Sequence, residues 1–187
     1  KIKKPSDAKR AGIGMVPEDR KLEGLVLPFD VESNISMASL DKISKFGFIN
    51  KSAEKALAEK QVESLKIKTP SIKTRVVSLS GGNQQKCIVG RWLETNPRIL
   101  IMDEPTRGID VGAKYEIYLL MKQIAESGGS IILISSELPE VLNMSNRVLT
   151  IYNGRITGEF NPEEVDAEKI MEKALGLKEN QEYEQAK

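Results

Sequence analysis

Ile99-Leu100-Ile101-Met102-Asp103-Glu104-Pro105 is the stretch of sequence that decides the fold. Its four apolar residues predict a short strand buried on both faces, as in a parallel sheet covered by helices. Asp103 and Glu104 follow at the carboxyl end of this strand, where open α/β sheets bind their ligands. An aspartate there can hold Mg2+ directly or through water, and the next glutamate can polarise an attacking water. The alternative is that two acids simply mark the end of a core strand.

A second informative stretch, Leu79-Ser80-Gly81-Gly82-Asn83-Gln84-Gln85-Lys86, precedes that strand. Ser80 predicts the N-terminal cap of a helix that runs to about residue 95. Two adjacent glycines let the backbone approach a ligand closely, and the free amides at a helix start favour an anion such as phosphate. The alternative is an ordinary capped helix whose glycines only permit tight packing. Together, the two stretches suggest that the protein handles ATP.

Composition narrows the class of protein. The 187 residues include 28 Lys and Arg against 27 Asp and Glu, which lacks the basic bias of a nucleic-acid-binding protein. Cys87 is the single cysteine and there is no histidine, which excludes an intrachain disulfide, a Cys/His metal cluster and a histidine base. The longest apolar runs are too short to cross a bilayer. We therefore expect a soluble, cytosolic chain with one domain or a domain with a subdomain.

The order of the predicted elements indicates an α/β fold. The apolar runs 13–16, 99–102 and 131–134 predict buried strands, and the helical pattern of 113–126 between the last two predicts a parallel βαβ unit. A helix-rich segment lies between the first two strands. Asn153-Gly154 predicts a hairpin with a type I′ turn, and Asn161-Pro162 predicts the start of a C-terminal helix.

These motifs resemble those of the ATP-binding cassette (ABC) family. LSGGNQQK (79–86) resembles the family's signature, ILIMDEP (99–105) its Walker B strand, and Gly108-Ile109-Asp110 its D-loop. The motifs come in the family's order, with a helical subdomain before the signature, and the resemblance covers nearly the whole chain. Asn83 in place of the commoner glutamine, the run DEPTRGIDVGAK (103–114) and the segment GMVPEDRK (14–21) are similar to the second half of fused-cassette importers of ribose, galactose and xylose.

The resemblance implies an α/β, P-loop NTPase-like cassette with a mainly parallel sheet, helices on both faces and a C-terminal β-hairpin. Across residues 1–187 it implies a partial nucleotide-binding domain, with a helical subdomain at about 30–95 inserted in an α/β core of 11–29 and 96–176. Residues 177–187 are expected to form a flexible tail. The Walker A loop is absent and the sequence begins at Lys1 without a methionine, so we expect a fragment of a longer protein.

The resemblance also implies a set of site residues and two cofactors, ATP and Mg2+. In the family each ATP lies between the Walker motifs of one cassette and the signature of the other. The implied roles are ATP binding in trans for Ser80, Gly81, Gly82 and Gln84, catalysis for Glu104, Mg2+ binding through water for Asp103, and an interface position for Asp110 in the D-loop.

Two positions depart from the family pattern. Glu18 stands in the Q-loop where a glutamine is expected, and Ser136 stands where the switch histidine is expected. Serine has neither the reach nor the charge of histidine. With Walker A also missing, we expect this domain's own ATP site to be weakened or silent and the isolated chain to be inactive.

The function implied by the resemblance is that of the ATPase subunit of a monosaccharide importer, bound peripherally at the cytoplasmic face of the cell membrane. The implied partners are a second cassette, fused N-terminally, membrane permease subunits and, indirectly, a sugar-binding protein, but no nucleic acid. Two alternatives remain. One is a non-hydrolysing regulatory or binding cassette, and the other is a soluble ABC ATPase of DNA repair or translation.

Several further residues have two interpretations each. One interpretation gives Arg107 a specific role, either neutralising nearby acids or contacting a partner cassette across the dimer interface. The alternative is a solvated charge. The residues around the start of the helical subdomain either form a groove for the permease or are buried in that subdomain, and we expect burial for at least two of them. They are Pro28, Phe29, Phe46 and Phe48. Cys87 and Trp92 are expected to be packing residues.

Overall fold

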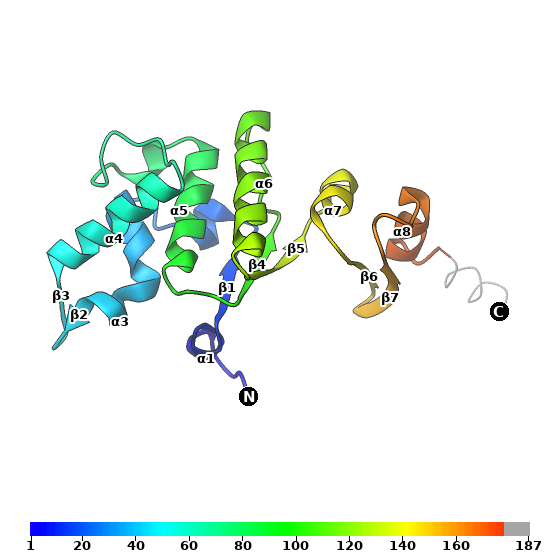
Figure 1. The fold of residues 1–187 in the computed structure, drawn as a ribbon, viewed down its shortest axis with the longest axis horizontal. Coiled ribbons are helices and arrows are strands. Elements are labelled where there is room, and N and C mark those ends of the chain that lie inside the picture. The colour runs from blue at the N-terminus through cyan, green and yellow to red at the C-terminus, as the bar shows by residue number, and fades with distance from the viewer. Residues whose placement is uncertain (178–187) are drawn as a thin grey trace. The chain divides into compact units, whose positions relative to one another are not determined.

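A three-stranded parallel sheet organises the first part of the chain (Figure 1). In the computed structural model, which describes residues 1–177, the strand order is β1 (Ile13–Val16), β4 (Ile99–Asp103) and β5 (Ser130–Ile134). Asp103, the last residue of β4, pairs with Ile134 of β5. The carboxyl ends of the strands therefore lie at one edge of the sheet, and the predicted parallel α/β fold is confirmed.

Helices and short turns fill the rest of this part of the chain. Helix α5 packs against β1 and α6 packs against β5, while α2, α4 and α5 pack together. The elements besides the sheet are α1 (Pro5–Arg10), η1 (Arg20–Gly24), α2 (Val31–Ser36), η2 (Met37–Ser39), α3 (Leu40–Ile43), β2 (Ser44–Lys45), β3 (Phe48–Ile49), α4 (Lys51–Ser64), η3 (Val76–Ser78), α5 (Gly81–Leu93) and α6 (Val111–Glu126).

The core of this unit is centred on α5. Residues 84–91 of this helix are all buried, and Cys87, Ile88 and Val89 have no exposed surface. Burial raises the pKa of the Cys87 thiol to about 12, so the thiol stays protonated at neutral pH. Cys87 is therefore a packing residue, as predicted.

Strand β5 departs from the expected burial. Ile132 is 51% exposed and Ile134 is 47% exposed, whereas Leu100 and Met102 of β4 are buried. Exposed and half-buried residues alternate along β5, and α6 packs against this strand, so among the described residues one face of β5 is covered and the other is left open. The prediction of a fully buried strand at 131–134 is wrong for that reason.

The chain separates into two units, residues 1–134 and residues 135–187. In the second unit, α7 (Leu138–Met144) is followed by strands β6 (Val148–Tyr152) and β7 (Arg155–Phe160), which pair antiparallel, and by α8 (Ala167–Ala174). Asn153 and Gly154 have φ of 46° and 75°, which confirms the hairpin turn with two left-handed residues. Helix α8 begins later than predicted, because residues 162–164 form a turn.

Three further sequence predictions concern membrane spans, the helical subdomain and the C-terminal tail. Among residues 1–177, no helix combines the length and apolar character that a membrane span requires. Residues 30–95 lie within the first unit and contain the predicted helices. The predicted flexible tail, apart from Leu177, lies outside the described residues.

Candidate functional site

Ser80 lies at the start of α5 and is exposed. It occupies the N-cap position with an extended backbone, but its side chain makes no capping bond to the helix. Instead, Ser80 Oγ accepts a hydrogen bond of 2.9 Å from Asn83 Nδ2. The predicted helix start is therefore confirmed, while the prediction that the Ser80 side chain caps the helix is wrong.

Both signature glycines allow other segments to approach closely. A Cβ on Gly81 would lie 3.0 Å from Arg20 Nη2, and a Cβ on Gly82 would lie 2.5 Å from the Cβ of Ala113 in α6. Gly82 is buried and Gly81 is half-buried. The first amides of a helix have no carbonyl partner within the helix, so they remain suited to an anion. The glycines thus have a packing role, and the predicted phosphate contact depends on Ser80 and on these backbone amides.

Gln84 faces the interior of the unit. Its side chain is 4% exposed, and Nε2 donates a 3.0 Å hydrogen bond to the carbonyl oxygen of Val76. In this structure the Gln84 side chain is therefore directed into the domain rather than toward its surface. The prediction that Gln84 binds ATP stays a prediction.

Asp103 and Glu104 lie at the carboxyl edge of the sheet, as predicted, and both are half-buried. Glu104 has φ of 44°, in the left-handed region that is costly for a residue with a side chain. Its amide donates to the Ile134 carbonyl at 2.9 Å, and its carbonyl accepts from the Arg107 amide at 3.1 Å. These bonds hold the sharp turn that follows β4.

The donor set limits how Mg2+ can bind. Within residues 1–177, no group of three or more His, Cys, Asp or Glu side chains could hold a metal ion. Mg2+ commonly takes one or two protein carboxylates and completes its shell with water and phosphate oxygens. Asp103 fits that pattern as a single carboxylate, provided that a nucleotide supplies the phosphates.

Two arginines connect the segment around Glu18 to the turn that follows Pro105. The guanidinium of Arg107 pairs with the carboxylate of Glu18, so the interpretation that Arg107 neutralises a nearby acid is confirmed. Arg20 donates from Nη1 to the carbonyl oxygen of Arg107 at 2.7 Å and from Nη2 to that of Gly108 at 3.0 Å. Sequence reasoning missed Arg20, because it was simply one member of a charged turn.

The other two predicted site residues are placed separately. Asp110 caps α6, since its Oδ1 accepts a 3.0 Å hydrogen bond from the Ala113 amide. This capping role is compatible with the predicted interface position, which stays a prediction. Ser136 is exposed and belongs to the second unit. Its predicted switch role also stays a prediction.

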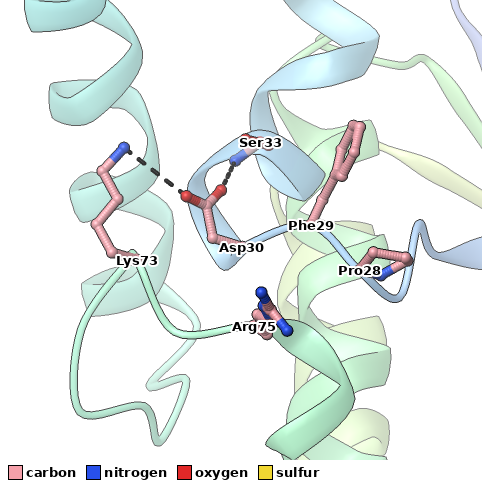
Figure 2. Close-up of a pocket in the computed structure, with 6 residues that line it drawn as sticks. All are labelled: Pro28, Phe29, Asp30, Ser33, Lys73 and Arg75. Atoms are coloured by element: carbon pink, nitrogen blue, oxygen red, sulfur yellow. Dashed lines mark hydrogen bonds and ion pairs between the residues drawn. The ribbon is translucent and has the colours of Figure 1, made fainter.

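A hollow of about 300 Å³ lies at the start of the helical segment (Figure 2). Asp30 Oδ1 accepts a 2.8 Å bond from the Ser33 amide, and Lys73 Nζ lies 3.8 Å from Asp30 Oδ2. Burial pushes the pKa of Asp30 upward, but the bonds from Ser33 and the charge of Lys73 outweigh it and lower the pKa. The hollow is lined by Pro28, Phe29, Asp30, Ser33, Lys73 and Arg75.

The phenylalanines and the proline expected around the start of the helical subdomain are not in the core. Phe29 is half exposed, while Phe46 and Phe48 are 90% and 80% exposed, and Pro28 is exposed as well. Phe46 lies in the turn of the two-stranded β2–β3 hairpin and Phe48 lies in β3, where Lys45 pairs with Phe48. The expectation that at least two of these four residues are buried is therefore wrong.

The ABC transporter family model matches residues 2–107, which include the signature and the Walker B strand. The chain belongs to this family. The xylose import ATP-binding protein XylG of Thermoanaerobacter pseudethanolicus is 55% identical over 177 residues, covering 95% of this chain and 35% of that protein. The ribose import ATP-binding protein RbsA of Oceanobacillus iheyensis is 52% identical over 175 residues, covering 94% of this chain and 35% of that protein. The chain thus spans about a third of the length of these ABC relatives.

Solved structures confirm the ABC cassette fold. A nucleotide-free ATP-binding cassette from an ABC transporter superposes with a TM-score of 0.75 at 22% identity, covering 92% of this chain and 72% of that chain. A dimeric cassette in a post-hydrolysis state, bound to ADP and Pi, gives a TM-score of 0.71 at 20% identity. The match covers 86% of this chain and 68% of that chain. At such identities the likeness concerns the fold.

Proposed function

We propose that this chain is the second cassette of the ATP-binding protein of a monosaccharide importer, which couples ATP binding and hydrolysis to transport. The names of the xylose and ribose import relatives support this function, because more than half of the aligned residues are identical. They favour it over a soluble ATPase of repair or translation. The proposed location is the cytoplasmic face of the membrane, where the protein is bound peripherally.

The observation that carries the proposal is the exposed Ser80 at the start of α5. Ser80, the backbone of Gly81 and the first amides of α5 form a donor group for the terminal phosphate of an ATP held by a partner cassette. Donors fixed in advance stabilise charge that develops during phosphoryl transfer. This chain therefore completes the partner's site, and the proposed partner is a second cassette fused on the N-terminal side.

This domain's own nucleotide site is proposed to be weak. Asp103 offers one carboxylate for Mg2+, and Glu104 occupies the position of the base. Glu18 at the Q-loop position is held by Arg107, which competes with a metal for its carboxylate. Ser136 at the switch position cannot supply a histidine's reach.

A second candidate function keeps the fold but lacks turnover. The Glu18–Arg107 pair and Ser136 favour a cassette that binds or regulates without hydrolysing ATP itself. The two functions differ in one respect: whether a partner site in the same assembly turns over ATP with the help of this signature.

The permease is proposed as a further partner of the first unit. The hollow in Figure 2 combines the exposed ring of Phe29 with the charges of Asp30, Lys73 and Arg75. A mixed apolar and charged concavity suits a polar-ended helix of a permease subunit. A sugar-binding protein on the far side of the membrane is an indirect partner.

The proposed function is tested by placing a carboxylate at Ser80. In the full-length protein assembled with its permease, Ser80→Asp is expected to abolish ATP hydrolysis, since it brings negative charge against the terminal phosphate. The measurement is the steady-state rate of phosphate release. Ser130→Asp is the matched control, because Ser130 is exposed at the opposite end of β5 from Ile134, and it should leave the rate unchanged. Undiminished turnover in Ser80→Asp would refute the assignment.

A further inference from the structure

We infer that Asn83 is a positioning residue, which turns the hydroxyl hydrogen of Ser80 toward the terminal phosphate of the partner's ATP. This inference rests on the proposed function and adds a residue whose side chain acts through Ser80. Its basis is a chain of two hydrogen bonds that ends on a fixed backbone amide.

The first step is the orientation of the Asn83 amide group. Asn83 Oδ1 accepts a 2.7 Å hydrogen bond from the backbone amide of Lys68, and Asn83 Nδ2 donates to Ser80 Oγ at 2.9 Å. A backbone N–H can only donate, so the atom facing Lys68 must be the carbonyl oxygen. The NH2 group must then face Ser80.

The second step is the consequence for the Ser80 hydroxyl. An NH2 group can only donate, so Ser80 Oγ is the acceptor in this contact and keeps its own hydrogen for another partner. The side chain is exposed and makes no bond to the helix it precedes. Its hydrogen is therefore directed away from Asn83 and is available to an acceptor that arrives from outside, such as a phosphate oxygen.

The third step is the rigidity of the support. Helix α5 also holds the segment that carries the Lys68 amide, because Lys86 Nζ donates a hydrogen bond to the Lys66 carbonyl oxygen at 3.2 Å. Lys86 is buried and also pairs with Glu116 of α6 at 2.8 Å. Asn83 and Lys86 are one helical turn apart, so both hold the 66–68 segment from α5. The Asn83 amide thus has a fixed anchor and cannot rotate freely.

The test is a double-mutant cycle on ATP hydrolysis by the full-length protein assembled with its permease. Asn83→Ala is expected to lower kcat about fivefold, the size of one net hydrogen bond, with the KM for ATP changed less than about twofold. Ser80→Ala should lower kcat at least as much. If Asn83 acts through Ser80, adding Asn83→Ala to Ser80→Ala should lower kcat no further.

The variant Asn83→Asp provides a second test, by comparison of its kcat with that of Asn83→Ala. An aspartate can still accept from the Lys68 amide, but its other oxygen can only accept, so it would draw the Ser80 hydrogen away from the phosphate. The loss of kcat should exceed that of Asn83→Ala and should shrink in the Ser80→Ala background. Asn96→Asp, three residues beyond the C-terminal end of α5, makes the same chemical change on an exposed residue and should leave kcat unchanged.

The outcomes separate the inference from the proposed function. If Asn83→Ala lowers kcat by the same factor with and without Ser80, its role is structural and the inference is overturned. An unchanged kcat in Asn83→Ala also overturns it. If Ser80→Ala itself leaves kcat unchanged, the proposed role of the signature fails, and the inference fails with it.

Discussion

Gly82 sets how closely the helices α5 and α6 approach each other. The Cβ of an alanine at this position would lie 2.5 Å from the Cβ of Ala113, which is far inside van der Waals contact. A glycine in a helix interior costs about 1 kcal/mol relative to alanine, and Gly82, the second residue of α5, bears part of that cost. The close packing of the two helices therefore requires a residue that is otherwise unfavourable there.

We expect Gly82→Ala to lower the free energy of unfolding by about 1–3 kcal/mol, because a tightly packed contact is overfilled. The companion change Ala113→Gly removes the opposing methyl group, so the double variant should regain most of the loss. Chemical denaturation monitored by circular dichroism measures both effects. Ala113→Gly alone gives the helix-propensity cost to subtract. A double variant no more stable than Gly82→Ala would show that another contact is responsible.

Residue-level roles were only partly predictable from the sequence. The helix start at Ser80 is predictable because a serine before a helical pattern is a local start signal, although the Ser80 side chain makes no capping bond. The interior bond from Gln84 to the Val76 carbonyl is not predictable from the motif, which does not reveal how deeply this position is buried. Arg20 was missed, because its acceptors lie 87 and 88 residues further along the chain and no local pattern connects them.

At the scale of elements, Lys86 ties α5 to α6. Its side chain is buried, and its ammonium group lies 2.8 Å from Glu116 Oε2, which is partly exposed. The hydrogen bond and charge of Lys86 lower the pKa of Glu116. A buried ammonium that loses its carboxylate is left poorly compensated, so the pair matters mainly through the lysine.

This pair gives a prediction for pH dependence. Because the folded pKa of Glu116 lies below its ordinary value of 4.5, its stabilisation is fully present above pH 4.5 and is lost as the pH falls through the folded pKa. Glu116→Gln should therefore be less stable than the native protein at pH 7, and the difference should narrow below pH 4.5. Urea denaturation at several pH values measures it. A difference that stays constant across that range would contradict the assigned ion pair.

Helices, strands and turns could be predicted where the residues within the element itself define it. Strands β1 and β4, helix α6 and the Asn153-Gly154 turn were predicted because apolar periodicity or turn chemistry defines them locally. Exposure was predicted less well. Ile132 and the aromatic residues Phe46 and Phe48 have core-like side chains, but whether such a side chain is covered depends on segments distant in the chain.

At the scale of the whole molecule, the two proposed ATP sites should differ in importance. In the full-length protein, Glu104→Gln is expected to lower ATP turnover far less than about 100-fold, the smallest contribution usual for a catalytic base. The physical reason is that Glu104 would serve this domain's own site, which is proposed to be weak. The steady-state rate of phosphate release checks this, with the equivalent change in the partner cassette as the comparison. A loss as large as that in the partner would show that this site hydrolyses ATP fully.

The open side of β5 has a practical consequence for anyone who produces this chain alone. Among residues 1–177, β5 pairs with β4 alone, so its other edge and the partly exposed Ile132 and Ile134 offer a template on which a second chain can extend the sheet. Light scattering of the purified chain should show a mass that grows with concentration above 20.8 kDa. A lysine in place of Ile132 should improve solubility and keep the chain monomeric over a wider range of concentrations.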